Sequence, residues 1–142
     1  MLSALMNTNM PWAPSAWKHW VDHIIRQGHK FGLKRATLVH ANGTTAAATS
    51  GFMLPSHEIQ KFAAYFDGVI KGDPERISLQ GKTYIIKSIS ASQIIAFNGS
   101  RYFVISRAKT MYIVVMCDSR TMYEDGARWL QRLTDSLVAK GY

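Results

Sequence analysis

The sequence contains little of what several large protein classes require. Cys117 is the only cysteine among 142 residues, which excludes an internal disulfide framework and any site built from several cysteines. No apolar run reaches the ~18–20 residues that cross a bilayer. Residues 1–11 have neither a basic segment nor a long apolar core, so we expect no secretory signal. These absences predict a cytoplasmic protein in which Cys117 is a small buried apolar residue.

Residues that could form a catalytic centre or a metal site are also scarce. His19 and His23 have helical i, i+4 spacing, but the sequence His19-Trp-Val-Asp-His23 lacks the glutamate of the helical zinc motif. There is no Gly-x-Ser-x-Gly elbow and no glycine-rich phosphate loop. The pair Glu124-Asp125 fits the positive end of a helix dipole better than an acid/base pair. We therefore expect no enzyme, no metal and no cofactor.

Positive charge is in surplus, because 17 lysines and arginines face 9 acidic residues and give a net charge of +8. Such a surplus favours acidic partners, namely nucleic acid, anionic lipid head groups or an acidic protein surface, without choosing among them. No block of five or six like charges forms a nucleic-acid-binding tail. The length fits one domain, which we place at residues 14–142 after a flexible extension at residues 1–13.

Apolar periodicity divides the chain into helices and strands. Helical spacing occurs at 15–27, at 57–70 and in a last segment whose apolar stripe includes Ala127, Leu130, Leu133, Leu137 and Val138. Runs rich in β-branched residues predict strands at 35–40, 44–49, 76–79, 82–89, 93–97, 101–106 and 110–117. Asn42-Gly43 predicts a type I′ turn between the first two strands. The pattern predicts an α+β domain with a central antiparallel sheet covered by the N- and C-terminal helices, side by side.

Aromatic residues are concentrated at the two ends of the chain. Trp17 and Trp20 lie about one helical turn apart, Trp12 precedes them and the chain ends in Tyr142. If the terminal helices pack side by side, these rings form one surface strip that suits a polyproline II peptide, whose carbonyls accept hydrogen bonds from indole N–H and phenol O–H groups. The alternative is that both tryptophans belong to the core, as helix-spaced aromatics usually do.

The order and spacing of several short motifs resemble the profilin family over residues 16–142. The quoted segments are Trp17-Lys-His-Trp20-Val-Asp22, Ala36-Thr-Leu-Val39, Asn42-Gly43, Ser50-Gly51-Phe52, Leu79-Gln-Gly81-x-x-Tyr84, Lys109-Thr110, Leu133-Thr-Asp-Ser-Leu137 and Gly141-Tyr142. The resemblance implies the same sheet and helix arrangement, with a shorter helix on the other face of the sheet. It also implies a monomeric cytoskeletal regulator that binds monomeric actin and proline-rich proteins such as formin-type segments.

The resemblance places a polyproline groove between the end helices. Trp17, Trp20 and Tyr142 match the aromatic residues of this groove, and we expect their rings to be open to water. Two positions depart from the family pattern, because Ala46 and Ser136 stand where relatives often carry rings. A groove with fewer rings is expected to bind more weakly or to prefer different peptides.

The resemblance also places an actin-binding face on the later strands and the start of the last helix. The matching positions are Thr83, Ile86, Ser88, Gly99, Arg101, Thr121, Met122, Ala127, Arg128 and Gln131. Arg101 and Arg128 supply the basic character that suits an acidic surface of actin. Ser88 departs from the basic residue that many relatives have. Phosphoinositide head groups are a further ligand that the family implies and the net charge favours.

Two other functions compete with this interpretation. A basic sheet could bind nucleic acid by stacking bases on strand aromatics, for which Tyr84, Tyr102 and Tyr112 are the candidates. No RNP motif is present, however, and we do not expect nucleic acid to be a partner. A trafficking adaptor with a similar helix–sheet–helix shape is the second alternative.

Overall fold

The computed structural model describes residues 14–69 and 75–142. Its helical segments are α2 (Pro14–Gly28), η1 (His29–Phe31), α3 (Ser56–Gln60), α4 (Phe62–Phe66), η2 (Arg120–Met122) and α5 (Tyr123–Ala139). Its strands are β1 (Leu33–His40), β2 (Thr45–Ala48), β3 (Arg76–Leu79), β4 (Lys82–Ile89), β5 (Gln93–Asn98), β6 (Arg101–Arg107) and β7 (Met111–Cys117). The proposed extension at residues 1–13 lies outside the described residues.

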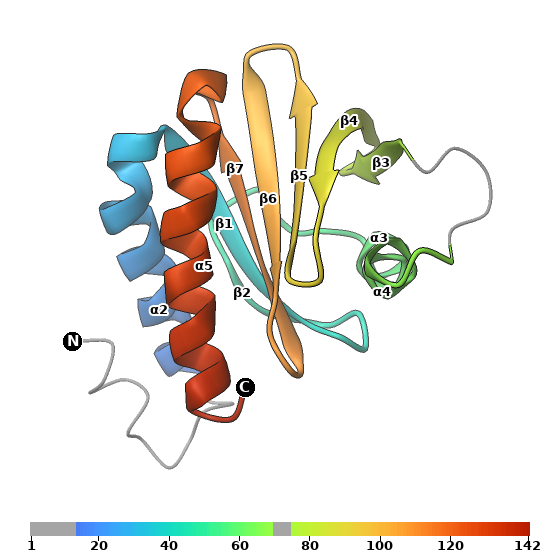
Figure 1. The fold of residues 1–142 in the computed structure, drawn as a ribbon. Coiled ribbons are helices and arrows are strands. Elements are labelled where there is room, and N and C mark those ends of the chain that lie inside the picture. The colour runs from blue at the N-terminus through green and yellow to red at the C-terminus, as the bar shows by residue number, and fades with distance from the viewer. Residues whose placement is uncertain (1–13, 70–74) are drawn as a thin grey trace.

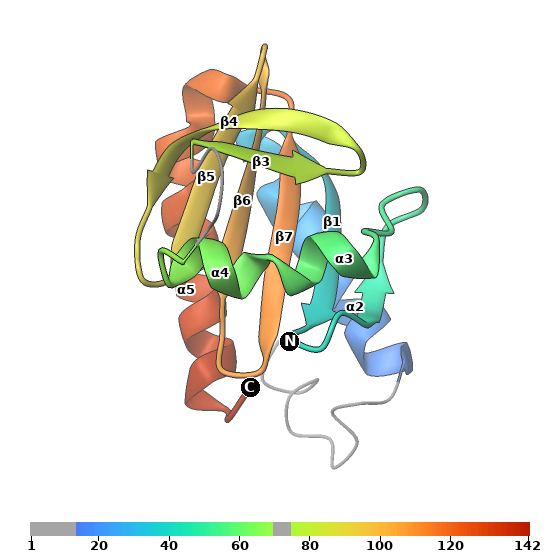
Figure 2. The ribbon, with the colours of Figure 1, turned by 90° about the vertical axis from the view of Figure 1, so that its right-hand side faces the viewer.

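One antiparallel sheet of seven strands forms the centre of the molecule, in the order β2-β1-β7-β6-β5-β4-β3. Helices α2 and α5 lie side by side on one face of this sheet (Figure 1), and α3 and α4 lie on the other face (Figure 2). Each face has its own apolar core, since the buried residues separate into two clusters. The predicted α+β architecture, with both terminal helices covering the same face, is confirmed.

Two local predictions were wrong. The helix expected at 57–70 consists of two short helices interrupted at Lys61, whose backbone N–H bonds to the carbonyl of Glu58 at 3.2 Å. This bond spans three residues and tightens the turn. The Asn42-Gly43 turn is not type I′, because only Gly43 has a positive φ, +99°. Asn42 instead accepts bonds from the N–H and hydroxyl of Thr44 at 3.0 and 2.7 Å, which stabilise a longer loop.

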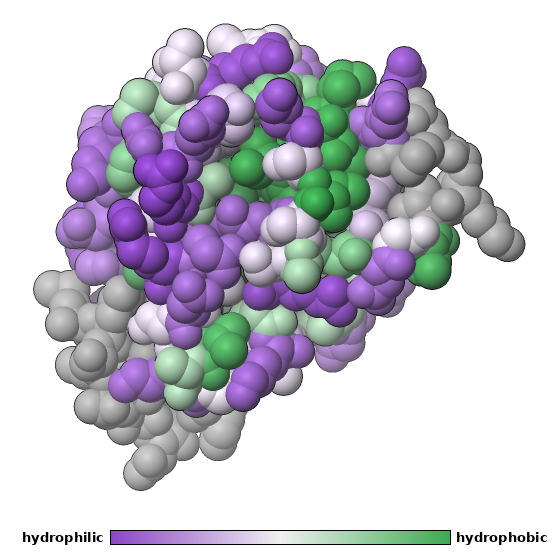
Figure 3. Space-filling model, viewed as in Figure 1, coloured by the Kyte–Doolittle hydropathy of each residue, from purple (hydrophilic) through white to green (hydrophobic). Residues whose placement is uncertain are grey.

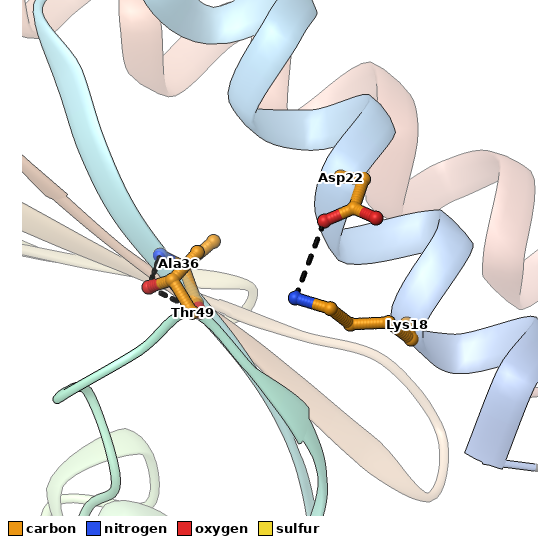
Figure 4. A network of polar contacts seen from close by, with 4 residues as sticks. All are labelled: Lys18, Asp22, Ala36 and Thr49. Carbon is orange, nitrogen blue, oxygen red and sulfur yellow. Dashed lines mark hydrogen bonds and ion pairs between the residues drawn. The ribbon is translucent and has the colours of Figure 1, made fainter.

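Polar contacts fix the elements around the first strand (Figure 4). Thr49 closes the β1–β2 hairpin, because its hydroxyl accepts from the N–H of Ala36 at 3.2 Å and donates to the carbonyl of Ala36 at 3.3 Å. On the solvent side of α2, Lys18 pairs with Asp22 at 3.3 Å. Both side chains of that pair are about half exposed, so it contributes ~0.3–0.5 kcal/mol. The position of α2 therefore depends on its apolar face.

The end of the chain is held against the turn between β6 and β7. The backbone carbonyl of Tyr142 accepts from the N–H of Thr110 at 2.7 Å and from its hydroxyl at 3.1 Å. Gly141, with φ of +98°, reverses the chain after α5. These contacts bring the phenol ring of Tyr142 beside α2.

Candidate functional site

The tryptophans of α2 are buried, so the expectation that their rings are open to water was wrong. Trp17 is 3% exposed and Trp20 is 1% exposed, and both belong to the core cluster beneath α2 and α5. With Val21 and Ile24 they follow i, i+3, i+4 and i+7 spacing and therefore lie on one face of the helix. That face packs on the sheet, so the alternative that both rings are core residues describes this structure.

Trp17 nevertheless differs from an ordinary core residue. Its indole Nε1 is buried and has no hydrogen-bond partner among the described residues. An unpaired buried N–H costs ~1–3 kcal/mol. The half-buried ring of Tyr142 meets the Trp17 ring edge-on, with 5.4 Å between centroids. Ala46 and Ser136, the other two groove positions, are also partly buried. The structure thus brings together a free donor and the C-terminal phenol.

A second surface lies where β4 and β5 extend beyond α5. Apolar side chains gather there in the space-filling view (Figure 3), and Ile85 on β4 is 51% exposed. A hollow of about 330 Å³ is lined by Thr83, Ile85, Phe97, Asn98, Gly99 and Arg120. The Arg120 guanidinium lies 4.0 Å from the centroid of the Phe97 ring and donates to the Gly99 carbonyl at 3.3 Å. An exposed apolar side chain next to a fixed cation is typical of protein-binding surfaces.

The pleat of β4 and β6 separates residues that we expected on one face. Thr83 and Ile85 point to the side of the hollow, whereas Ile86 packs against the cluster on the opposite side of the sheet. Arg101 lies on the same side of β6 as buried Phe103, also opposite to the hollow, and pairs with Asp118 at 3.6 Å. The expectation that Ile86 and Arg101 share a face with Thr83 was therefore wrong.

Three residues of the hollow were not among those expected from the sequence: Ile85, Phe97 and Arg120. A signal for Ile85 was present, because strand alternation puts Thr83 and Ile85 on one side and Tyr84 with Ile86 on the other. Phe97 pairs with Ile85 across β4 and β5. Arg120 carried no local signal, since it reaches the hollow from η2 after β7.

The remaining expected actin contacts come from several elements: Gly99 lines the hollow, Ser88 lies on β4 outside its lining, Thr121 and Met122 follow Arg120 in η2, and Ala127, Arg128 and Gln131 lie on α5. Ser88, Gly99, Thr121 and Arg128 are exposed, Met122 and Gln131 are partly buried, and Ala127 is buried with 5% of its surface exposed. Arg128 bonds to Asp125 at 3.3 Å within the helix. Gln131 accepts from the Ser92 hydroxyl at 3.0 Å, which joins α5 to the loop before β5. Ala127 contributes packing rather than a free contact surface.

The strand tyrosines offer no stacking platform for nucleic acid. Tyr84, Tyr102 and Tyr112 are between 0% and 4% exposed. Burial raises the pKa of all three phenols. The Tyr102 hydroxyl donates to the carbonyl of Phe31 at 3.1 Å, so this ring ties β6 to η1. The base-stacking alternative, which needs exposed rings, is contradicted by this burial.

Cys117 is 1% exposed, as expected. Its burial in the core raises the pKa of the Cys117 thiol to about 12, mainly through desolvation. The thiol is therefore protonated at neutral pH and does not act as a nucleophile.

Within the described residues, no group of three His, Cys, Asp or Glu side chains is placed to hold a metal ion. No described helix is long and apolar enough to span a membrane.

Comparison with solved structures shows the same fold in several profilins. Fission yeast (Schizosaccharomyces pombe) profilin has 26% identity and a TM-score of 0.74, covering 89% of this chain and 99% of that one. Acanthamoeba castellanii profilin IB has 19% identity and a TM-score of 0.77 with the same coverage. LokiProfilin1, solved in complex with rabbit actin, has 18% identity and a TM-score of 0.67, covering 85% of this chain and 96% of that one.

Comparison by sequence gives the family. No curated protein matches the chain at a significant level. The profilin family model, in contrast, matches residues 15–142, which is nearly the whole chain. The trafficking-adaptor alternative is set aside by this match. The chain belongs to the profilin family.

Proposed function

We propose that this protein binds monomeric actin through the hollow between β4, β5 and η2, and that it regulates actin polymerisation without catalysing a reaction. The observation that carries the proposal is Ile85, an isoleucine left 51% exposed at the edge of this hollow. The complex of LokiProfilin1 with rabbit actin supports the choice of partner. Actin-binding, non-enzymatic proteins make up the family that the chain matches.

The hollow has the composition of a binding site with a small apolar centre and a charged margin. Ile85 offers apolar area that a partner side chain can cover. Arg120 is already ordered by the Phe97 ring and the Gly99 carbonyl, so little side-chain entropy is lost when it meets an acidic group. Thr83 and Gly99, which the family resemblance assigns to the actin face, line the same hollow.

The test is binding of the full chain to fluorescently labelled monomeric actin, measured by anisotropy. Ile85→Asp places a carboxylate in the apolar centre, and we expect the affinity to fall about tenfold or more because the charge must be desolvated on binding. Met53→Asp is the matched control, since Met53 is 61% exposed and does not line the hollow. Equal affinities of the two variants would contradict the proposed surface.

The second part of the proposal is binding of proline-rich peptides at the contact between α2 and the C-terminal residue. Its support is the buried Trp17 Nε1, a donor without a partner among the described residues, next to the Tyr142 phenol. A peptide carbonyl would supply the missing acceptor. Because Trp17 is 3% exposed, binding requires a local opening, and we assign this movement to Tyr142.

Retention of the full chain on polyproline resin tests this part. Because Tyr142 has to move, Tyr142→Ala should lose the phenol contact while uncovering the indole. We expect the variant to be retained more weakly than wild type. We also expect its tryptophan fluorescence to change more than that of wild type when polyproline is added. Unchanged retention and unchanged fluorescence response would refute the assignment of Tyr142.

Phosphoinositide head groups complete the proposed set of ligands, supported by the net charge of +8. The proposal includes a monomeric protein located in the cytoplasm at the cytoskeleton. Co-sedimentation with vesicles that contain phosphatidylinositol bisphosphate tests the lipid component, and binding that equals that of phosphatidylcholine vesicles would remove it.

A further inference from the structure

A buried carboxylate on α3 lies outside both proposed binding surfaces. Glu58 is 4% exposed, and its helix lies on the face of the sheet opposite to α2 and α5 (Figure 2). Glutamate is almost never buried to this degree without partners, because removing an ionised carboxylate from water is costly unless hydrogen bonds compensate it. The hydrogen bonds of Glu58 therefore show which part of the fold this carboxylate stabilises.

The carboxylate of Glu58 accepts three hydrogen bonds from the end of β3 and the turn that follows it. The backbone N–H of Gln80 donates to Oε1 at 2.6 Å, the N–H of Gly81 donates to Oε2 at 3.0 Å, and the Ser78 hydroxyl donates to Oε2 at 3.2 Å. Successive backbone N–H groups in a turn form a concave site for an anion. The β3–β4 turn supplies this site, and Glu58 fills it.

The turn benefits from such a partner because its backbone is strained. Gln80 and Gly81 join β3 to β4, and both have positive φ, +52° and +76°. This combination is typical of a type I′ turn, whose first central residue is usually asparagine, aspartate or glycine. For glutamine the left-handed conformation is unfavourable. The bonds to Glu58 offset this strain, and the Gln80 side chain adds bonds to the carbonyls of Gly51 and Met53 at 2.9 and 3.3 Å.

The position of the turn is transmitted to the actin-binding hollow through the first half of β4. Residues 82–84 have their registered partners on β3, and pairing with β5 begins only at Ile85. The Asn98 side chain adds one bond from β5, to the Thr83 carbonyl at 3.1 Å. A two-stranded hairpin alone is marginally stable in water. Thr83 and Ile85, which line the hollow, therefore depend on the contacts that hold the β3–β4 turn.

We propose that Glu58 is a positioning residue for the surface around Ile85. Its carboxylate fixes the β3–β4 turn from the opposite face and thereby holds the first half of β4 against the rest of the sheet. Loss of the carboxylate lets the hairpin open locally while the other strands stay folded. A surface that is formed for only part of the time binds its partner more weakly in proportion. The link to actin rests on the proposed function, whereas the role of Glu58 in the turn does not.

Relaxation-dispersion NMR of the isotopically labelled full chain tests the turn directly, because it detects opening on the microsecond-to-millisecond timescale. Glu58→Gln keeps the size of the side chain and replaces one acceptor oxygen by an amide group that cannot accept. We expect conformational exchange at the amides of residues 78–85 and none in β6 or β7. His57→Gln, at an exposed neighbouring position on α3, is the matched control and should behave as wild type. Ser78→Ala removes one of the three bonds and should show the same local exchange to a smaller extent, so it replaces Glu58→Gln if that variant does not fold.

Binding to labelled monomeric actin is measured on the same variants. Glu58→Gln should bind about threefold to tenfold more weakly, although its higher net positive charge would by itself favour an acidic partner. Adding Gln80→Gly to Glu58→Gln should restore much of the affinity and reduce the exchange, because glycine adopts positive φ without strain. A general loss of stability would leave the affinity unchanged as long as nearly all molecules stay folded.

The outcomes separate this inference from the proposed function. Absence of exchange in the hairpin of Glu58→Gln, or exchange spread over β6 and β7 as well, would overturn the inference. Local exchange with wild-type affinity for actin would also overturn it if Ile85→Asp weakens binding. If Ile85→Asp binds actin as tightly as wild type, the actin proposal fails, and the relaxation data on the free protein alone decide the role of Glu58.

Discussion

Replacing Trp17 by phenylalanine separates the two roles of its indole. The substitution removes the Nε1–H donor, which is buried without a partner among the described residues, and keeps an aromatic ring against Tyr142. If the donor serves a ligand, its loss must weaken binding of a proline-rich peptide. If the residue serves only packing, the same change must act on stability alone. Trp20→Phe is the matched control, because Trp20 is equally buried at 1% exposure.

The expected magnitudes differ between the two positions. At Trp17, removal of an unpaired buried N–H recovers ~1–3 kcal/mol, while the smaller ring leaves a cavity that costs a similar ~1–2 kcal/mol. The two terms nearly cancel in the free energy of unfolding. The lost hydrogen bond to a peptide carbonyl is worth ~0.5–1.5 kcal/mol, or about 2- to 12-fold in Kd. Trp20→Phe has the cavity cost without this binding effect.

Two assays on the same variants decide the matter. Urea unfolding followed by circular dichroism gives the free energy of unfolding, and isothermal titration with a proline decamer gives Kd. We expect Trp17→Phe to bind more weakly with nearly unchanged stability, and Trp20→Phe to be less stable with unchanged Kd. A Trp17→Phe variant that binds the peptide as tightly as wild type would refute the role of the indole N–H.

Three further predictions follow from the core and from α2. Cys117, with a pKa of about 12 and 1% exposure, should react with a thiol reagent such as DTNB at pH 8 only after unfolding in urea. Gly126→Ala should destabilise the fold by ~1–3 kcal/mol, because a Cβ there collides with the Tyr102 hydroxyl; urea unfolding measures the loss. Burial, assisted by the charge of Arg26, lowers the pKa of His23 below 6.5, so the native state favours the neutral imidazole. Stability should therefore fall as pH drops from 7.5 to 5.5, and less steeply in His23→Gln.

Each of these predictions has its own control. Rapid reaction of the native thiol of Cys117 would contradict its burial. The cost of Gly126→Ala should shrink in a Tyr102→Phe background, where the hydroxyl is absent; an undiminished cost would place the collision elsewhere. For His23, the comparison is the pH slope of His19→Gln, since His19 is exposed on the same helix. Identical slopes for both variants would exclude a specific contribution of His23.

Much of the fold could be predicted from the sequence, because local periodicity reports which residues share a face. The apolar stripe of α2 runs from Trp17 to Ile24, and α5 has a similar stripe. These stripes indicated two helices that each pack one apolar face against the sheet. The β-branched runs with short loops indicated an antiparallel sheet. Such patterns depend on backbone geometry that each segment adopts by itself. The family resemblance rested on the same order and spacing.

The state of the candidate site could not be read in this way. Periodicity shows that Thr83 and Ile85 share one side of β4 and that Ile86 is on the other, but which side stays open depends on how far α5 extends over the sheet. The burial of Trp17 likewise depends on the sheet and on Tyr142, which are distant in sequence. Packing between distant elements has no local signature in the sequence.

The sequence alone determined the helices and strands, the two-faced sheet and the surplus of positive charge. Only the tertiary structure decided that Ile85 stays exposed, that Arg120 reaches its hollow from η2, and that a bulge in β1 leaves Lys34 without a partner of its own on β7. The physical reason is that side-chain direction in a strand follows a period of two only until one extra residue or one covering helix changes it.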